Sequence, residues 1–452
     1  MAFPFPRQRH ACSRVRVERG ARSAHRDRAR PRPPVHSLVL GLVLAWSLLA
    51  CPFAFAADPL PGADAASIRA WLYANNPQLR ALQYDADAAD ARIQPAGALP
   101  DPMASVELDD IDPDRPSLLP SKVGATTYRL KQQFPLWGKR ELSRDVARFE
   151  AQSARYERDA TALDLLAQAE EAYVRYWHIR EAVVVIDRRI ALLDQIEEVA
   201  GVRYALGMAV QQDSIRAQVE HTAMQRERIE RLATRRQAMA GLNALLGRRA
   251  DAPLAEPAGQ PVLVVEDSTL AAALQRLDRG THPALQASTA MATAANRNVE
   301  LVRRDRFPDV SLSLGTMQRG NRLDGYEVMV EVEIPFQQRA RRERERESRL
   351  IEDGALARTS ATRSELHGRL GSAWARWTSA REQRELVEKT LLPQTDANFK
   401  SAMASYQVGE VDFGTLLEAL REWQGADLAR LDATRDELLG AAAVRAINGE
   451  AR

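Results

Sequence analysis

The chain carries two copies of one long sequence pattern, and this duplication constrains its fold more than any other feature. Asn76-Pro77-Gln78-Leu79 returns as His282-Pro283-Ala284-Leu285, and Tyr204-Ala205-Leu206-Gly207 returns as Tyr406-Gln407-Val408-Gly409. A period of about 200 residues is too long for a solenoid repeat. The sequence therefore predicts one body made of two repeats, about 58–250 and 260–447, of a single strand-and-helix unit.

The N-terminus has the composition of an export signal. Arginines between Arg7 and Arg32 precede the apolar run from Ser37 to Ala50, and Ala54-Phe55-Ala56 supplies a cleavage site. Residues 1–56 are thus predicted to be a signal peptide that is removed. A rival site, ending in Cys51, resembles a lipobox and would instead acylate that cysteine. The apolar run is too short for a spanning helix, which needs about 20 residues, so any membrane crossing is expected to use strands.

The charge balance and the motifs limit the classes of function that the chain can have. Without residues 1–56 the chain holds 53 basic and 59 acidic residues, a balance of −6, so a nucleic-acid partner is not indicated. The histidines are scattered without ligand spacing. No phosphate loop or nucleophile elbow is found, so neither catalytic residues, nor a metal site, nor a cofactor is expected.

Long helices with a coiled-coil seam make up most of each repeat. From Lys139 to about Arg203, and again from Arg339 to Leu392, small and apolar residues recur at spacings of four and three. Pro393 is expected to end the second of these helices. Each is followed by a shorter partner, about 214–246 and 415–444, so each repeat contains an antiparallel helical hairpin.

Between the helices the periodicity changes to two, which indicates strands at about 103–110, 123–134, 310–317 and 326–334. One face is apolar, while the other carries Arg129 and Lys131 in the first repeat and Glu327, Glu331 and Glu333 in the second. Such strands suit a transmembrane barrel with a polar lumen, although a half-buried soluble sheet would look similar. Polar linkers at 109–122 and 318–324 are typical of surface loops. Four strands cannot close a hollow barrel, so several chains must contribute.

These motifs, in this order and duplicated, resemble the TolC-like outer-membrane efflux family over nearly the whole chain beyond residue 56. The marks are the N-P-x-L opening, Gly97-Ala98-Leu99-Pro100-Asp101-Pro102, Phe134-Pro135-Leu136-Trp137-Gly138-Lys139-Arg140 and the two Y-x-x-G tips. The resemblance implies a mainly α fold with a small β part. It also implies a homotrimer in which four strands per chain form a twelve-stranded barrel, joined to a long helical tunnel. The Pro-rich stretch 251–280 would form a belt around that tunnel, and residues 214–246 and 283–305 would be two short helices stacked end to end.

The same resemblance assigns a periplasmic entrance to the hairpin tips, about 204–214 and 406–416. Asp213 and Glu418 fall on acidic entrance positions and Tyr406 on an aromatic link position, while Thr415 replaces a third acid. Glu410 and Asp412 lie close enough to substitute for that acid. Tyr204, Gly207 and Gly409 would form the turns. The alternative interpretation is a pair of solvated turns, in which glycine and acidic residues are common.

The implied function is an outer-membrane exit duct that reaches into the periplasm and passively conducts what a tripartite efflux pump delivers. Its expected partners are a periplasmic adaptor (membrane fusion) protein, an inner-membrane pump of the resistance-nodulation-division type and outer-membrane lipid. The Leu-Pro-Asp-Pro element and the strand exit at 134–140 are closest to members that serve heavy-metal cation pumps. Two alternatives stay open: a type I secretion duct for polypeptides and a structural coiled-coil protein of the periplasm.

Overall fold

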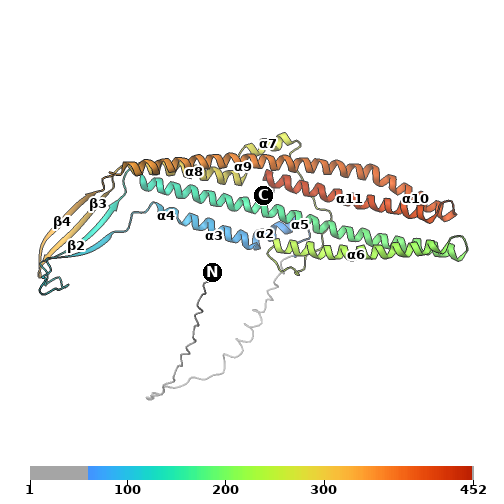
Figure 1. Cartoon of the computed structure of the whole chain (residues 1–452), viewed down its shortest axis with the longest axis horizontal. Coiled ribbons are helices and arrows are strands. Elements are labelled where there is room, and N and C mark those ends of the chain that lie inside the picture. Colours follow the sequence, from blue (N-terminus) through green and yellow to red (C-terminus); the bar gives the residue numbers. More distant parts are fainter. Residues whose placement is uncertain (1–59, 450–452) are drawn as a thin grey trace, which may run out of the picture. The chain divides into compact units, whose positions relative to one another are not determined.

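The computed structural model describes residues 60–449, so the predicted signal peptide and Cys51 lie outside the described residues. Helices dominate, and the prediction of a mainly α chain with a small β part is confirmed (Figure 1). The first repeat contains α2 (Ala65–Asn75), α3 (Pro77–Ala91), α4 (Ile93–Ala96), β1 (Met103–Asp109), β2 (Ala125–Phe134), α5 (Lys139–Ala205) and α6 (Gln211–Leu245). The second contains α7 (Leu270–Asp278), α8 (Pro283–Arg304), β3 (Val310–Arg319), β4 (Arg322–Val332), α9 (Gln338–Leu386), a π-helical turn (Val387–Leu391), α10 (Leu392–Val408) and α11 (Phe413–Asn448).

The four strands form one antiparallel sheet in the order β1-β2-β3-β4. The β2–β3 pairing joins the two repeats, with Arg129 opposite Gly315. β4 begins at Arg322, inside the stretch 318–324 that was expected to be a loop. That expectation is wrong because Arg319 pairs with Arg322, and Gly320, at φ 58°, lets the chain reverse in a tight turn. Residues 110–124 do lie between strands β1 and β2.

The shorter helices α6 and α8 pack along different stretches of α5. The Ser153 hydroxyl donates to the Ala287 carbonyl of α8 at 3.0 Å, whereas Asp187, much farther along α5, accepts from Arg228 of α6 at 2.6 Å. The expectation that α6 and α8 stack on each other is wrong. The C-terminus of α6 meets α3 instead, because the Asn76 side chain caps α3 and also donates to the Leu245 carbonyl at 2.8 Å.

Pro393 does not end the long helix of the second repeat. The chain continues from α9 through the π turn into α10 without leaving helical geometry. A proline removes one backbone donor and crowds the preceding turn, and a wider π turn just before it accommodates both effects. The helix therefore runs on to Val408 at the second tip.

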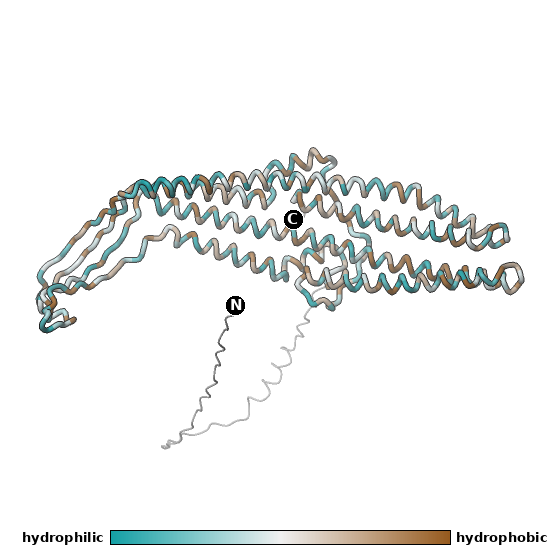
Figure 2. The backbone as a smooth tube through the Cα atoms, in the orientation of Figure 1, coloured by the Kyte–Doolittle hydropathy of each residue, from teal (hydrophilic) through white to brown (hydrophobic). Residues whose placement is uncertain are grey.

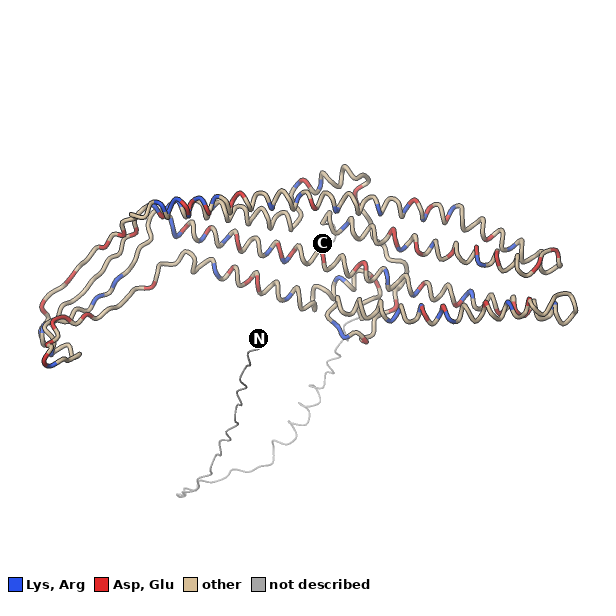
Figure 3. The backbone as a smooth tube through the Cα atoms, viewed as in Figure 1, with Lys and Arg blue, Asp and Glu red and all other residues tan. Residues whose placement is uncertain are grey.

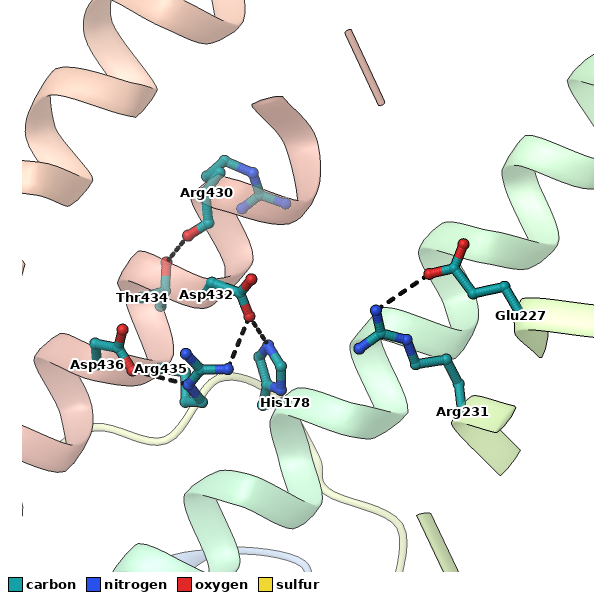
Figure 4. Close-up of polar contacts among 8 residues, drawn as sticks. All are labelled: His178, Glu227, Arg231, Arg430, Asp432, Thr434, Arg435 and Asp436. Atoms are coloured by element: carbon teal, nitrogen blue, oxygen red, sulfur yellow. Dashed lines mark hydrogen bonds and ion pairs between the residues drawn. The ribbon is translucent and has the colours of Figure 1, made fainter. Parts of the chain in front are cut away.

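Polar contacts join helices across the core. Glu170 of α5 is buried and accepts from Arg69 at 3.3 Å and from Arg445 at 3.4 Å, which ties α2 and α11 to α5. Farther along, the His178 ring of α5 contacts the Asp432 carboxylate of α11 at 2.8 Å, and Arg435 donates to the same carboxylate (Figure 4). These contacts fix the register between helices that are distant in sequence.

Candidate functional site

The polar face of the sheet is held together by ion pairs across strands. The Arg129 guanidinium lies 3.0 Å from Glu327 and 3.3 Å from Glu107, and the Lys131 ammonium contacts Glu331. Three strands thus share one network of opposite charges. The structure brings together the basic residues of the first repeat and the acids of the second, as the alternation of side chains requires.

Gly315 makes the contact between Arg129 and Glu327 possible. It lies between Arg129 and Glu327 in the row that crosses β2, β3 and β4. A Cβ atom at position 315 would lie 3.0 Å from the Tyr128 carbonyl oxygen and 3.7 Å from Arg129. Because glycine has no side chain, the guanidinium can reach over β3 to the carboxylate on the next strand.

An acidic depression of about 370 Å³ lies at the helix-proximal end of this polar face. Its lining includes Asp101, Asp309, Glu331, Glu333 and the single cation Lys131. The Asp309 carboxylate is held by the Lys139 ammonium at 3.0 Å, so it is partly neutralised. Glu333 lies just beyond β4, with its backbone N–H bonded to the Asp309 carbonyl. The depression therefore keeps an excess of carboxylates.

The opposite face of the sheet is apolar and exposed. Figure 2 shows the hydropathy changing along the strands, and the exposed set comprises Val106, Leu130, Leu312, Leu314, Val328, Val330 and Val332. Exposed apolar surface of this extent marks a membrane or a protein interface.

At the second hairpin tip, Tyr406 is buried between the two hairpins. Only 2% of it is exposed, its ring meets Phe413 edge-on at 5.5 Å, and the Arg203 guanidinium lies 4.6 Å from the ring centroid. Burial raises the pKa of the Tyr406 phenol and the charge of Asp213 raises it further, whereas Arg203 lowers it. The phenol oxygen has no hydrogen-bond partner within the described residues. The structure thus brings Asp213 and Tyr406, from different repeats, into one electrostatic neighbourhood.

The remaining predicted entrance acids are arranged differently. Asp412 caps α11 by accepting from the Thr415 N–H at 2.8 Å, a bond that lowers the pKa of its carboxyl, so it is committed to a structural contact. Glu410 accepts weakly from the Ser405 hydroxyl at 3.4 Å. Glu418 is exposed on α11. The hydrogen bond to Glu220 is the largest cause that raises the pKa of Arg421, and the charge of Glu418 raises it further. Tyr204 is about half exposed.

The two tip glycines terminate their helices in the same way. Gly207 at φ 73° follows α5 and Gly409 at φ 87° follows α10, both in the left-handed region. The next N–H in each tip bonds back to a carbonyl five residues earlier, from Met208 to Arg203 and from Glu410 to Ser405. This is the glycine-terminated helix end that permits a tight reversal.

Arg203 is the tip residue that the sequence analysis missed. Its guanidinium donates to the Tyr406 carbonyl and, at 3.2 Å, to the Met208 carbonyl, so one side chain ties both tips. A second missed contact is the ion pair of Arg421 with the largely buried Glu220, at 2.6 Å. When the two repeats are aligned, Arg203 of the first falls opposite Ser405 of the second. This difference between the copies was the sequence signal for Arg203.

Within the described residues, no helix has both the length and the apolar character required to traverse a bilayer. Residues 60–449 also contain no group of three or more His, Cys, Asp or Glu side chains arranged to hold a metal ion.

Comparison with known proteins finds similarity to a family of membrane channels. The family model for the outer membrane efflux protein matches residues 274–450, the second repeat. The cobalt-zinc-cadmium resistance protein CzcC of Cupriavidus metallidurans is 24% identical over 81% of this chain and 84% of its own length. The outer-membrane channel OprN matches with TM-score 0.72 at 18% identity, covering 85% of this chain and 89% of that one.

CusC, known from crystal structures that describe folding and transmembrane channel formation, matches with TM-score 0.72 at 15% identity over 86% of this chain and 92% of its own. The second repeat is thus similar to the outer membrane efflux protein family, and the chain has the fold of these channels over most of its length.

Proposed function

We propose that three copies of the chain form the outer-membrane exit duct of a tripartite efflux pump for divalent heavy-metal cations. The duct is supported chiefly by the sheet, which has one polar face, one apolar face and unpaired edges at β1 and β4. In lipid, the backbone groups of an open edge cannot be solvated, so the sheet must close with other copies. Three sheets give twelve strands, with the apolar face toward lipid and the ion-paired face toward a water-filled lumen.

The helical hairpins then continue the lumen into the periplasm, where the two tips of each chain form the entrance. Asp213, Glu410 and Glu418 present carboxylates there, and Tyr406 with Arg203 holds the hairpins together. The turns at Tyr204-x-x-Gly207 and Tyr406-x-x-Gly409 would dock a periplasmic adaptor, which connects the duct to an inner-membrane pump of the resistance-nodulation-division type. The stretch 251–280 would be the belt of this tunnel.

The heavy-metal cargo is supported by two features. The first is the likeness to a cobalt-zinc-cadmium resistance protein over four fifths of the chain. The second is the excess of carboxylates in the depression at the base of the sheet, which would attract cations and not anions. Conduction would be passive, with the pump supplying the energy.

Deletion of the gene from its own host tests this function. Tolerance to Co²⁺, Zn²⁺ and Cd²⁺ should fall severalfold and return with the wild-type gene, while tolerance to organic antibiotics stays unchanged. Loss of a secreted polypeptide, with metal tolerance intact, would instead support the type I secretion duct. Loss of drug tolerance alone would refute the metal cargo and leave the duct itself standing.

A further inference from the structure

Arginines gather where the strands meet the helices (Figure 3). In the first turns of α9, Arg339, Arg342, Arg346 and Arg349 follow one another at spacings of three, four and three, which places them on one flank of the helix. All four are exposed. Arg341 and Glu345 lie on another side of the helix, facing α8: Arg341 donates to the Asp305 carbonyl, and Glu345 accepts from Arg303 at 3.2 Å.

This basic flank works against the local stability of the helix. The N-terminal end of a helix carries partial positive charge, which favours acidic residues, yet the first turn of α9 contains none and its N-cap makes no side-chain hydrogen bond. Arg346 lies 3.8 Å from Glu343 and Arg349 lies 2.6 Å from Glu345, whereas Arg339 and Arg342 form no ion pair with any described residue. Two cations that cost stability at the start of a helix, without a partner among the described residues, are expected at a site that serves another purpose.

The apolar surface of the sheet ends directly beside this flank. Val330, Val332, Ile334 and Phe336 are exposed in succession, and Arg339 comes three residues after Phe336. Aromatic side chains from both repeats lie near the same level.

Trp137 stacks on Phe307 at 5.1 Å, and the Arg306 guanidinium lies 4.9 Å from the Phe307 ring centroid. Aromatic residues concentrate at membrane–water interfaces. In the barrel of the proposed function, on which this step rests, the guanidinium groups would therefore lie at the depth of lipid headgroups.

We propose that Arg339, Arg342 and Arg346 form a binding site for the phosphate groups of anionic phospholipids in the leaflet next to the helices. Guanidinium groups bind phosphate oxygens through paired, charge-assisted hydrogen bonds. The exposed Arg304, at the end of α8, adds a further cation close by. The far end of the sheet carries charges of both signs, since Asp110, Asp112 and Asp114 follow β1 while Arg319 and Arg322 flank the turn between β3 and β4. Anionic lipid would thus hold the channel at its helical end, a role separate from the cargo.

Lipid binding to the full chain, purified as the assembled channel, tests the site. Phosphatidylglycerol and phosphatidylcholine are titrated into detergent micelles, and the lipid retained per chain is counted by native mass spectrometry. A cation near an anionic surface contributes about fivefold in affinity, so R339Q/R342Q/R346Q should weaken phosphatidylglycerol binding at least tenfold and leave phosphatidylcholine unchanged.

Three controls keep the outcome specific. R339K/R342K/R346K should retain most of the affinity, because the charge stays. R358Q/R363Q/R376Q removes the same charge from exposed positions on α9 that begin about 18 Å farther along the helix, and it should bind as wild type. Free glycerol phosphate at matched concentration should not displace the lipid. Wild-type affinity in the glutamine variant, equal loss in the distant variant, loss in the lysine variant, or displacement by glycerol phosphate would each overturn the proposal.

Discussion

At the scale of single residues, Arg203 is the clearest candidate for a latch. Its hydrogen bonds to the Tyr406 and Met208 carbonyls join hairpins that come from different repeats. Bonds from a charged donor contribute about 1.5–3 kcal/mol each. We expect Arg203→Gln to raise the conductance of the channel in planar bilayers about tenfold or more, because the closed arrangement of the tips loses this link.

Arg226→Gln is the matched control for the latch, because Arg226 is an exposed arginine on α6 of the same hairpin. It should leave conductance unchanged. Equal conductance of Arg203→Gln and wild type would show that the latch has no part in closing the entrance.

The contact between His178 and Asp432 predicts a pH dependence. The hydrogen bond from His178 lowers the pKa of Asp432 below its ordinary 3.8, with Arg435 acting in the same direction. A carboxyl pKa that is lower in the folded state than in the unfolded state stabilises the folded protein at pH values above the unfolded-state pKa. This stability is lost as the pH falls through the folded-state pKa.

Helical circular dichroism of the wild type during urea unfolding should therefore show stability falling below about pH 3.8. Asp432→Asn should show a smaller decline over that range. Identical slopes for both proteins would mean that other carboxyl groups dominate acid unfolding.

At the scale of elements, the approach of α9 to α11 depends on one glycine. A Cβ atom at Gly440 would lie 2.7 Å from the Trp377 Cα atom, whereas a Cβ at Gly425 of the same helix would meet nothing within 4 Å. Gly440→Ala should destabilise the chain by about 1–3 kcal/mol through overpacking. Gly425→Ala should stabilise it by up to about 1 kcal/mol, the ordinary helix preference for alanine.

Urea titration of both variants gives the comparison. Both substitutions replace a glycine of α11 by alanine, so they differ only in whether the backbone of a neighbouring helix lies close to the new side chain. Equal stability changes in the two proteins would contradict the close approach of α9 and α11.

At the scale of the whole molecule, the proposed closure of the sheet with other copies can be tested on its two faces. An arginine on the lipid-facing side of a barrel strand costs about 2–4 kcal/mol at the bilayer midplane, whereas one facing the lumen costs little. Val330→Arg should therefore reduce the trimer in the outer-membrane fraction, as measured by light scattering after extraction.

Met329→Arg, one residue earlier on β4 and on the opposite face, is the control and should assemble normally. The reverse result would show that the faces are assigned backwards. A stable monomer of wild-type protein would refute closure by three chains.

Several features of this architecture could be predicted from local pattern alone. Alternation of side chains identified the two faces of the strands, and the four-three spacing identified the long helices. Asp213 and Tyr406 could be placed at the tips because the Y-x-x-G turns mark them. Other features could not be predicted. The contacts of Arg203 and the meeting of α6 with α3 depend on neighbours about 200 residues away in the sequence. The passage of the helix through Pro393 depends on a π turn, which has no sequence signature.

By itself, the sequence determined the duplicated plan, the switch between strand and helix periodicity, and the charge of each strand face, since these follow from how successive side chains project from a regular backbone. Only the tertiary structure decided which acids are committed to a cap, such as Asp412, and which charge joins the two tips. It also showed that Arg339 and Arg342 of α9 form no ion pair with any described residue, near the level where the apolar sheet ends. The reason is physical: a hydrogen bond or ion pair depends on the distance between two side chains, and between remote segments that distance exists only once the helices have packed.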